Sequence, residues 1–309
     1  MIRFISDILF VSPKASAACR ASIVSAGGIS LLQYFPNHRY RSTFSKSSTP
    51  RLEYICHVGE DASHMPRSMH EHDHLCEIVF VYQGAGIYMI DGRRYTAQKG
   101  DLIFYNSHSV HDEFGGTGSG LGTYCVAVSG LRIDDMPADH LLPTGLSPVQ
   151  PTRSHFTEVL HLFESIEQEA KNHAEIANYL TMALLTKLAA FLREEGIPEK
   201  QQTPTLVTEA RSFIDKNYKE NIRLNDIAKA THTNAYYLSH LFKAEVGLSP
   251  MKYVILRRLG EAQNLLINTD MTITQIAAQV GYNNSNYFQN VFKSALNMTP
   301  GEYRRKWTV

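Results

Sequence analysis

The sequence predicts an α+β protein with two domains: an N-terminal antiparallel β-barrel carrying a helical hairpin, and a C-terminal all-α domain. Three observations predict this class. Short hydrophobic runs alternate with Gly and Asp turns, apolar residues then recur at helical spacing, and one helical pattern finally occurs twice. A chain of 309 residues is long enough to form two domains. We expect four segments in this order: a barrel domain over 1–150, a helical hairpin over 151–195, a linker over 196–206 and a helical domain over 207–309.

Charge is divided unevenly along a chain whose formal net charge is zero. From Thr205 onward the chain has 13 Lys and Arg against 8 Asp and Glu, which leaves 17 basic and 22 acidic residues before that point. A basic C-terminal part indicates a polyanion partner for that part alone. No run of 18 apolar residues occurs, so we expect no transmembrane helix and no membrane partner.

Cysteine usage favours buried free thiols in a reducing cytoplasm over a disulfide framework. The chain contains four cysteines, none in a CxxC pair: Cys19, Cys56, Cys76 and Cys125. An apolar patch at residues 8–11 is too short for a signal peptide, and Asp7 precedes it. We expect residues 1–19 to be a strand or arm on the first domain, or partly disordered, and residues 38–50 to be a loop.

Residues 52–128 carry the β signal. A hydrophobic run at residues 75–82 is followed by shorter runs, which the Asp91-Gly92 and Gly100-Asp101 turns separate. Short strands joined in this way predict an antiparallel sandwich or barrel.

Histidines and one glutamate mark the entrance and the later strands of this barrel. His70 and His72, two positions apart on a strand, point to the same side, and Glu77 and His111 can complete a cation site. Strand alternation places Gln83 on the same face as Glu77. The expected effector-pocket residues are His70, His72, His74, Glu77, Gln83 and His111.

The spacing His70-x-His72, four residues, Glu77, six residues, Gly84 resembles the first cupin motif. Gly100-Asp101 leading to His111 resembles the second, more loosely. The resemblance implies a jelly-roll barrel. In a cupin enzyme it also implies His70, His72, Glu77 and His111 as ligands of iron, manganese or zinc. Three interpretations stay open: a metal site, a metal-free pocket for a polar small molecule, and surface residues with no direct role. We favour the metal-free pocket and expect no cofactor.

Residues 154–195 switch to helical period. Phe156, Val159 and Phe163 begin one apolar stripe, and Leu180, Leu184 and Leu188 belong to a second. The pattern predicts a helical hairpin that packs on the barrel or forms a homodimer interface. Gly196, Pro198 and Pro204 then indicate an interdomain linker.

Residues 224–303 contain one pattern twice. Ile227-Ala228 return 49 residues later as Ile276-Ala277, whereas Phe242-Lys243 return 50 residues later as Phe292-Lys293. The change of offset predicts one extra residue in the second turn. Each copy predicts two short helices with a tight turn, a helix-turn-helix, and a long helix at 251–267 joins the copies. Four residues are expected as helix caps or stops: Asn234, Gly247, Thr272 and Asn283. Gly281 supplies the second turn, while the first turn lacks Gly, so His232 or Thr233 must tolerate its backbone geometry.

Residues 208–307 resemble the DNA-binding domain of the AraC/XylS transcriptional regulators. These stretches carry the resemblance: Leu238-Ser239-His240-Leu241-Phe242-Lys243, Gly247-Leu248-Ser249-Pro250, Ile273-x-x-Ile276-Ala277-x-x-Val280-Gly281-Tyr282 and Thr299-Pro300-x-x-Tyr303-Arg304. The resemblance implies a second, effector-sensing domain, often cupin-like and followed by dimerisation helices. The expected segment order matches this plan.

The resemblance also implies that the second helix of each motif lies in the major groove. Mapping by motif position gives the base-reading candidates Tyr236, Ser239, His240, Ser285, Asn286, Gln289 and Asn290. Asn and Gln pair with adenine, so we expect an A·T preference in the second copy. The expected phosphate contacts are Lys243, Lys293, Arg304 and Arg305.

The sequence therefore favours a ligand-responsive regulator, expected to be a cytoplasmic homodimer that activates transcription from promoter DNA, with RNA polymerase as a further candidate partner. The expected effector is a sugar or a related metabolite, and no catalysis is expected. Two rivals remain: a metal-dependent cupin enzyme or metal sensor with a helical tail, and a constitutive DNA-binding protein whose barrel only dimerises.

Overall fold

The structure is a computed structural model, which describes residues 19–26, 29–36, 42–59, 68–112, 120–199 and 205–307. The chain divides into two units, Met1–Thr43 and Phe44–Val309. In the first unit, β1 (Cys19–Ala26) pairs antiparallel with β2 (Ile29–Pro36). The expectation for residues 1–18 lies outside the described residues.

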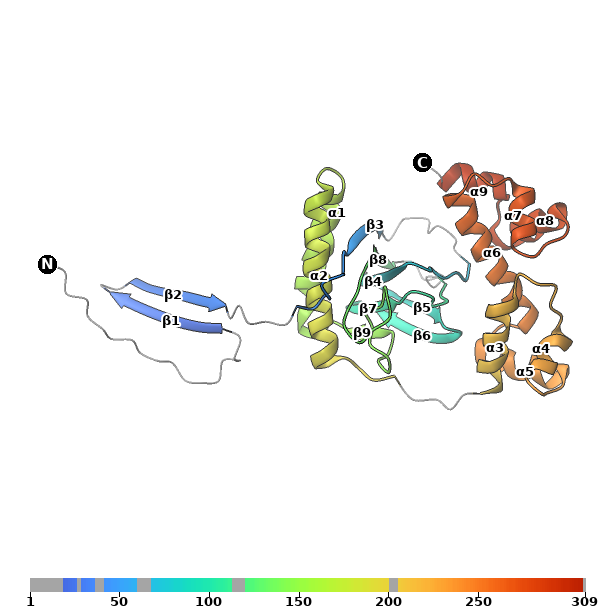
Figure 1. Cartoon of the computed structure of the whole chain (residues 1–309), viewed down its shortest axis with the longest axis horizontal. Helices are drawn as coiled ribbons and strands as arrows, with labels where there is room; N and C mark the ends of the chain where they lie inside the picture. The colour runs from blue at the N-terminus through green and yellow to red at the C-terminus, as the bar shows by residue number, and fades with distance from the viewer. Residues whose placement is uncertain are drawn as a thin grey trace. The chain divides into compact units, whose positions relative to one another are not determined.

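The second unit begins with the predicted antiparallel β domain, which is confirmed (Figure 1). Its larger sheet has the strand order β3 (Arg51–Val58), β8 (Gly122–Ser129), β4 (Leu75–Gln83), β7 (Asp101–Tyr105), β9 (Val149–Pro151). A two-stranded sheet of β5 (Ala85–Ile90) and β6 (Arg93–Gln98) accompanies it. Side chains of β4 alternate between two cores. Val79 and Val81 pack with Tyr88 and Ile90 of β5, whereas the other face of the strand packs against helices.

The predicted helical hairpin covers that other face. A short 3₁₀ turn, η1 (Arg153–His155), leads into α1 (Phe156–Ala170), and α2 (Ala174–Glu195) returns antiparallel to it (Figure 1). Phe163 of α1 and Leu184 of α2 are fully buried in one core with Phe80 of the sheet. The apolar stripes are therefore used to pack on the barrel domain, one of the two expected alternatives.

Helix α2 is also long and apolar enough to count as a membrane-span candidate by length and composition, with 44% of its apolar window buried. The core helix of a soluble protein meets the same criteria. Leu184, Leu185 and Leu188 of α2 lie in the core beneath the sheet.

The expectation of buried thiols is only partly right. Among the described side chains Cys76 is buried and Cys125 is half-buried, but Cys56 is exposed. Cys56 lies on β3, which is an edge strand of the larger sheet among the described residues.

The C-terminal part of the second unit contains the two predicted helix-turn-helix motifs, which are called helix-turn-helix units below. The first is built from α3 (Leu206–Asn217), α4 (Leu224–Ala230) and α5 (Ala235–Val246). The long helix α6 (Pro250–Asn268) leads to the second, formed by α7 (Ile273–Gln279), α8 (Ser285–Leu296) and α9 (Pro300–Trp307). Each helix-turn-helix lies on a separate apolar core, and α6 contributes to both: Tyr253 and Val254 to the first, Leu259 and Leu266 to the second. The first core also includes Met69, Met89 and Val110 of the β domain.

The two turns differ as the offset predicts. Four residues separate α4 from α5 and five separate α7 from α8, so the extra residue is in the second turn. His232 has a φ of 51° and Gly281 a φ of 87°, which confirms that the first turn places a histidine in left-handed geometry. One cap is shifted: the side chain of Asn284, not Asn283, accepts the N–H of Tyr287.

Candidate functional site

The second helix of each helix-turn-helix unit repeats the same pattern of exposure. In α5, Leu238 and Phe242 are buried beneath exposed Tyr236, His240 and Lys243. In α8, 50 residues later, Phe288 and Phe292 are buried beneath exposed Asn286, Asn290 and Lys293. Ser239, Ser285 and Gln289 are half-buried at the edges of these faces. The predicted base-reading residues thus lie on two solvent-facing helix surfaces of equal length.

Two exposed tyrosines on these surfaces were missed by the sequence analysis. Tyr237 is 52% exposed and Tyr287, its counterpart 50 residues on, is 59% exposed. Both follow the N-cap of their helix by three positions, where the backbone N–H is held by Asn234 or Asn284. A large aromatic residue at the same solvent-facing position of both copies was the signal that could have identified them.

Arg304, an expected phosphate contact, is engaged within the protein. Its guanidinium donates hydrogen bonds to the carbonyl oxygens of Leu266 (3.0 Å), Thr269 (3.3 Å) and Met271 (2.6 Å) at the C-terminal end of α6. These donors hold α9 against α6 and give Arg304 a structural role, while its contact with a phosphate stays a prediction. Lys243, Lys293 and Arg305 remain exposed.

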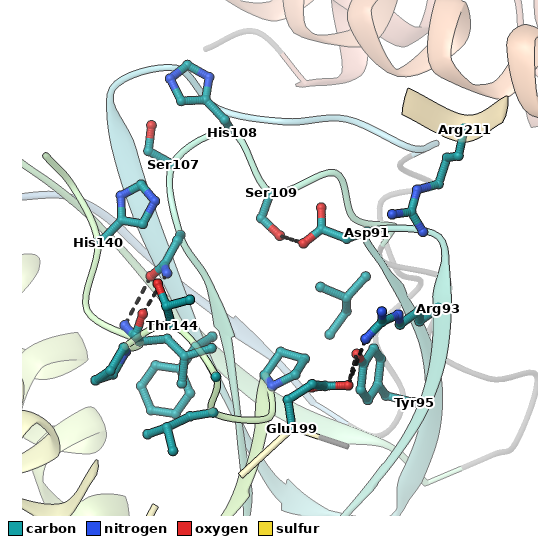
Figure 2. Close-up of a pocket in the computed structure, with 18 residues that line it drawn as sticks. Asp91, Arg93, Tyr95, Ser107, His108, Ser109, His140, Thr144, Glu199 and Arg211 are labelled. Atoms are coloured by element: carbon teal, nitrogen blue, oxygen red, sulfur yellow. Dashed lines mark hydrogen bonds and ion pairs between the residues drawn. The ribbon is translucent and has the colours of Figure 1, made fainter. Parts of the chain in front are cut away.

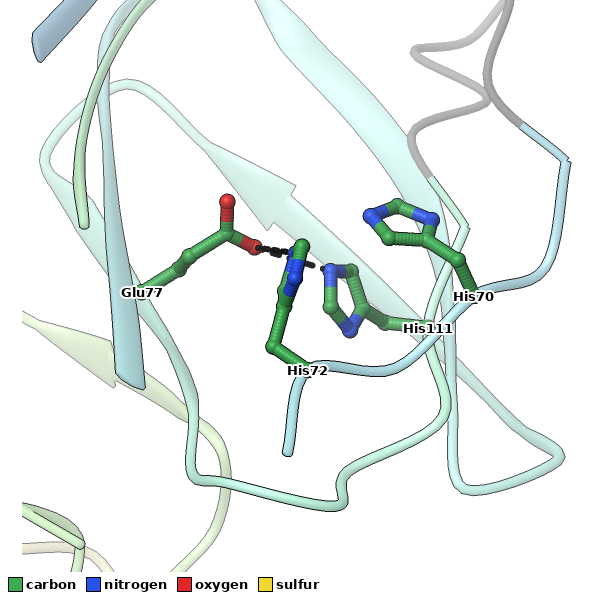
Figure 3. Close-up of side chains that lie close together, drawn as sticks. All are labelled: His70, His72, Glu77 and His111. Carbon is green, nitrogen blue, oxygen red and sulfur yellow. Dashed lines mark hydrogen bonds and ion pairs between the residues drawn. The ribbon is translucent and has the colours of Figure 1, made fainter. Parts of the chain in front are cut away.

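The histidine cluster is the second candidate site, defined here as His70, His72, Glu77 and His111. One potential ligand atom of each residue lies within 4.8 Å of the others (Figure 3). The backbones of His70 and His111 pair antiparallel, with both N–H···O distances at 2.9 Å. Glu77 projects from β4 toward them, so a local bridge and a sheet strand together bring distant residues to one point.

The side chains of the cluster are held in defined orientations. Nδ1 of His70 lies 3.0 Å from the carbonyl oxygen of Ser68, and Nδ1 of His111 lies 2.9 Å from that of Ser109. An imidazole that donates from Nδ1 to a carbonyl leaves Nε2 free to act as a ligand. The His111 ring also stacks on Tyr105 at a centroid distance of 3.8 Å.

Glu77 is the electrostatic centre of the cluster. One carboxylate oxygen is 2.9 Å from Nε2 of His111 and 3.5 Å from Nε2 of His72, and Tyr54 donates a hydrogen bond to the other. Burial by itself would raise the pKa of Glu77, but the neighbouring imidazoles of His111 and His72 outweigh it and hold the pKa well below its usual range. If His111 donates from Nδ1, the contact between Nε2 and the Glu77 carboxylate requires a proton or a cation between them.

The other two expected pocket residues lie outside the cluster. His74 is exposed at the start of β4. Gln83 is half-buried at the end of the strand, and the register shifts between Val81 and Gln83. This β-bulge interrupts the alternation that led us to expect Gln83 beside Glu77.

The cluster has the chemistry of a transition-metal site. Three imidazole nitrogens and one carboxylate suit zinc, iron or manganese. A tetrahedral ion with ligand bonds of about 2.0 Å needs ligand atoms about 3.3 Å apart, so the present spacing requires a modest contraction. The buried Nε2 of His72 has no hydrogen-bond partner within the described part of the chain.

A separate cavity of about 430 Å³ is large enough for a small metabolite. Arg93, Tyr95 and Glu199 line one side, and Figure 2 shows the ion pair and hydrogen bond that join them, both 3.1 Å. Burial first, and then the negative charge of Glu199, raise the pKa of Tyr95 to about 12. His108 and Arg211 complete a polar lining that sequence analysis did not identify, because its residues come from five separate stretches of the chain.

Comparisons with known proteins are consistent with this arrangement. Residues 54–189 match a family model described as an AraC-like ligand binding domain, and residues 227–306 match one described as a helix-turn-helix domain. An uncharacterized HTH-type transcriptional regulator, YdiP of Escherichia coli K12, is 25% identical over 85% of this chain and 89% of its own length. The HTH-type transcriptional activator RhaS of Enterobacter sp. 638 is 26% identical over 76% of this chain and 87% of its own.

Among solved structures, the C-terminal domain of AraT, a response regulator from Geobacillus stearothermophilus, is 32% identical. The match covers 36% of this chain and 91% of that one, with a TM-score of 0.34.

Proposed function

The chain belongs to the AraC family of transcriptional regulators, and from that premise we propose that it binds promoter DNA through α5 and α8 and responds to an effector bound by its N-terminal β domain. The observation that carries the proposal is the repeated exposed face of two helices, each supported by its own buried core. Proteins of this kind read base edges with the second helix of each motif. We propose activation of transcription, since RhaS is named an activator.

The two reading helices offer different chemistry. In α8, Asn286, Gln289 and Asn290 carry side-chain amides, which pair with the N6 and N7 of adenine. In α5, the ring of Tyr236 lies 4.4 Å from that of His240, so this helix presents an aromatic pair. We propose that α8 reads an A·T-containing half of the site and that Lys243 and Lys293 contact phosphates.

We propose that residues 1–150 form the effector module, 151–195 a dimerisation hairpin, 196–206 a linker and 207–309 the DNA-binding domain. Exposed Ile176 and Tyr179 on α2 support a dimer contact there, because the buried stripe of that helix is already used by the barrel. A homodimer in the cytoplasm, with RNA polymerase as a further partner and no catalytic activity, completes the proposal.

The effector is proposed to be a small polar molecule. A sugar or related metabolite fits the cavity beside Arg93 and Glu199 in size, and the lining offers charged and hydroxyl groups for hydrogen bonds. A second candidate function, metal-responsive regulation, is favoured by the convergence of His70, His72, Glu77 and His111. In that case the four residues would hold the ion, and the cluster would be the effector site.

Binding-site selection from random duplexes, followed by fluorescence anisotropy, tests the DNA-binding proposal. The full-length chain is expected to select a defined site, and Gln289→Ala is expected to weaken binding to that site by about 1–3 kcal/mol. Thermal unfolding with a panel of sugars and divalent metals tests sensing. A protein that selects no sequence would contradict the DNA-binding proposal. A protein that binds DNA but that neither sugars nor metals stabilise would contradict the sensing proposal alone.

A further inference from the structure

Arg257 of α6 connects the DNA-binding part to the segment that carries the histidine cluster. Its side chain is 1% exposed, and one guanidinium nitrogen lies 2.6 Å from a carboxylate oxygen of Glu71. Nε of the same side chain lies 2.9 Å from Asp215 of α3, and the guanidinium lies 4.8 Å from the ring of Tyr218. Asp215 and Tyr218 belong to the DNA-binding part, so Glu71 is the one carboxylate in this group that comes from the β domain.

The backbones of α6 and of residues 68–72 lie close together at the same place. A Cβ added to Gly260 of α6 would meet the carbonyl oxygen of Met69 at 1.9 Å, a separation that no side chain tolerates. Three residues further along α6, the side chain of Gln263 accepts the N–H of Ser68 at 2.7 Å. Arg257, Gly260 and Gln263 recur at a spacing of three and therefore share one face of the helix. This face of α6 and the segment 68–72 form the contact, which we name the α6 contact.

The segment in this contact is also half of the histidine cluster. His70 and His72 are cluster members, and Glu71 lies between them. In an extended segment, alternate side chains point to opposite sides. His70 and His72 thus point toward Glu77, while Glu71 points toward Arg257. Any movement that draws the two histidines together on a ligand must also move Glu71.

The contact is located where α6 passes from one helix-turn-helix unit to the other. Val254 belongs to the core of the first unit, and Leu259 to the core of the second. Arg257 lies between them. A change at this point acts on the helix that sets the distance and angle between α5 and α8, on which simultaneous binding of two groove segments depends.

We propose that the α6 contact couples the histidine cluster to the DNA-binding part, with Arg257 as the positioning residue. The proposal rests on the proposed function, in which the cluster is an effector site of a DNA-binding regulator. A ligand that closes His70 and His72 onto Glu77 and His111 withdraws Glu71 from Arg257. Arg257 then keeps only its partners within the DNA-binding part, Asp215 and the ring of Tyr218, and α6 is released from the segment 68–72.

Hydrogen exchange on the full-length chain tests the coupling, with Zn²⁺ as the ligand probe. In the wild type, Zn²⁺ is expected to slow exchange of the segment 68–75 and to speed exchange of α6 around Arg257 about fivefold or more. Two variants break the contact by different means, Glu71→Ala by charge and Gly260→Ala by steric conflict. In both variants the amide hydrogens of α6 should exchange rapidly without Zn²⁺, and adding Zn²⁺ should not change their exchange further.

Glu261→Gln is the matched control. It removes a carboxylate from the same helix, one position from Gly260, but its partner is Lys219 at 2.9 Å within the DNA-binding part. This variant should respond to Zn²⁺ as the wild type does. Gly260→Ala raises helix propensity, so faster exchange in that variant cannot be attributed to a weaker helix.

His111→Ala, compared with the wild type without metal, perturbs the cluster directly and is expected to change exchange at α6. The proposal is overturned if α6 responds to neither Zn²⁺ nor His111→Ala, or if its response persists in both Glu71→Ala and Gly260→Ala. Anisotropy on the selected duplex separates this result from failure of the proposed function. If the wild type binds DNA and the Glu71→Ala and Gly260→Ala variants bind it with the same affinity, the coupling is rejected while the proposed function stands.

Discussion

Nε2 of His111 lies 2.9 Å from a carboxylate oxygen of Glu77, although the two residues are 34 positions apart in the sequence. Both side chains are almost fully buried. Burying a carboxylate is unfavourable unless a partner compensates for the lost hydration. His111 and Tyr54 are the partners that compensate here. If Nδ1 of His111 donates to Ser109, the contact between Nε2 and the carboxylate requires a proton or a cation between them.

Removal of cluster residues should abolish metal binding. The wild type is expected to bind about one Co²⁺ or Zn²⁺ per chain, and His72→Ala combined with His111→Ala should remove this binding, as measured by calorimetry and metal analysis after dialysis. His74→Ala is the matched control, because His74 is an exposed histidine of the same segment. Equal metal uptake by the wild type and the double variant would contradict the metal site.

Substitutions on α8 should change sequence preference more than overall affinity for DNA. Asn290→Ala and Gln289→Ala remove amides from the exposed face of this helix, so each should cost about 1–3 kcal/mol on the selected site and little on random DNA. Ser294→Ala, an exposed position further along α8, serves as the control. Equal losses on specific and random duplexes would show that these residues do not read bases.

Lysine substitutions on the same helices should act through charge. Lys243→Ala and Lys293→Ala should each weaken binding to all duplexes and reduce the slope of log K against log salt by about 1, because each removes one phosphate contact. Lys216→Ala, on α3, is the comparison of equal charge outside the reading helices. An unchanged salt slope in both variants would remove these lysines from the interface.

Substitutions in the two turns should change the free energy of unfolding by different amounts. Gly281→Ala places a Cβ at positive φ and 2.3 Å from the carbonyl oxygen of Lys219, so it should destabilise the chain by about 2 kcal/mol or more. His232→Gly relieves left-handed geometry in the first turn and should change the free energy of unfolding by less than about 1 kcal/mol. Thermal and urea unfolding measure both, and similar losses would show that backbone geometry does not distinguish the turns.

Glu302 should contribute stability only above acidic pH. The N–H of Thr299 and then its hydroxyl donate hydrogen bonds to this carboxylate and lower its pKa. Because the pKa is lowered in the folded state, the contribution is present above about 4.3, the ordinary value for Glu, and is lost as the pH falls through the folded value. The Tm difference between wild type and Glu302→Gln should therefore shrink between pH 7 and pH 3. A constant difference would contradict a contribution of the Glu302 carboxylate to stability.

Local patterns were sufficient to predict the helix-turn-helix units. Caps such as Asn234 and Thr272 act within three residues, and the apolar period identifies the buried side of each helix without knowledge of its neighbours. The one-residue difference between the turns followed from comparing the copies. The shift of the cap from Asn283 to Asn284 shows the limit, since adjacent asparagines have the same capping chemistry.

The β domain was predictable in class but not in its details. The resemblance to the two cupin motifs brought His70, His72, Glu77 and His111 together correctly, and strand alternation placed His70 and His72 on one side. It failed for Gln83, because a β-bulge is decided by how neighbouring strands pair and twist. Motif spacing also gave no indication of the cavity beside Glu199, because the residues that line this cavity come from distant segments of the chain.

The sequence by itself determined the helical repeat and the solvent-facing sides of α5 and α8, since both depend on periodicity. The resemblance to the cupin motifs implied the four residues of the histidine cluster. Only the tertiary structure decided that Arg304 holds α9 to α6 and that Arg257 meets Glu71 across 186 positions of the chain. Pairings of this kind depend on how completed elements pack. Guanidinium groups bind phosphates and carboxylates alike, so their partner is chosen by the fold and not by the residue type.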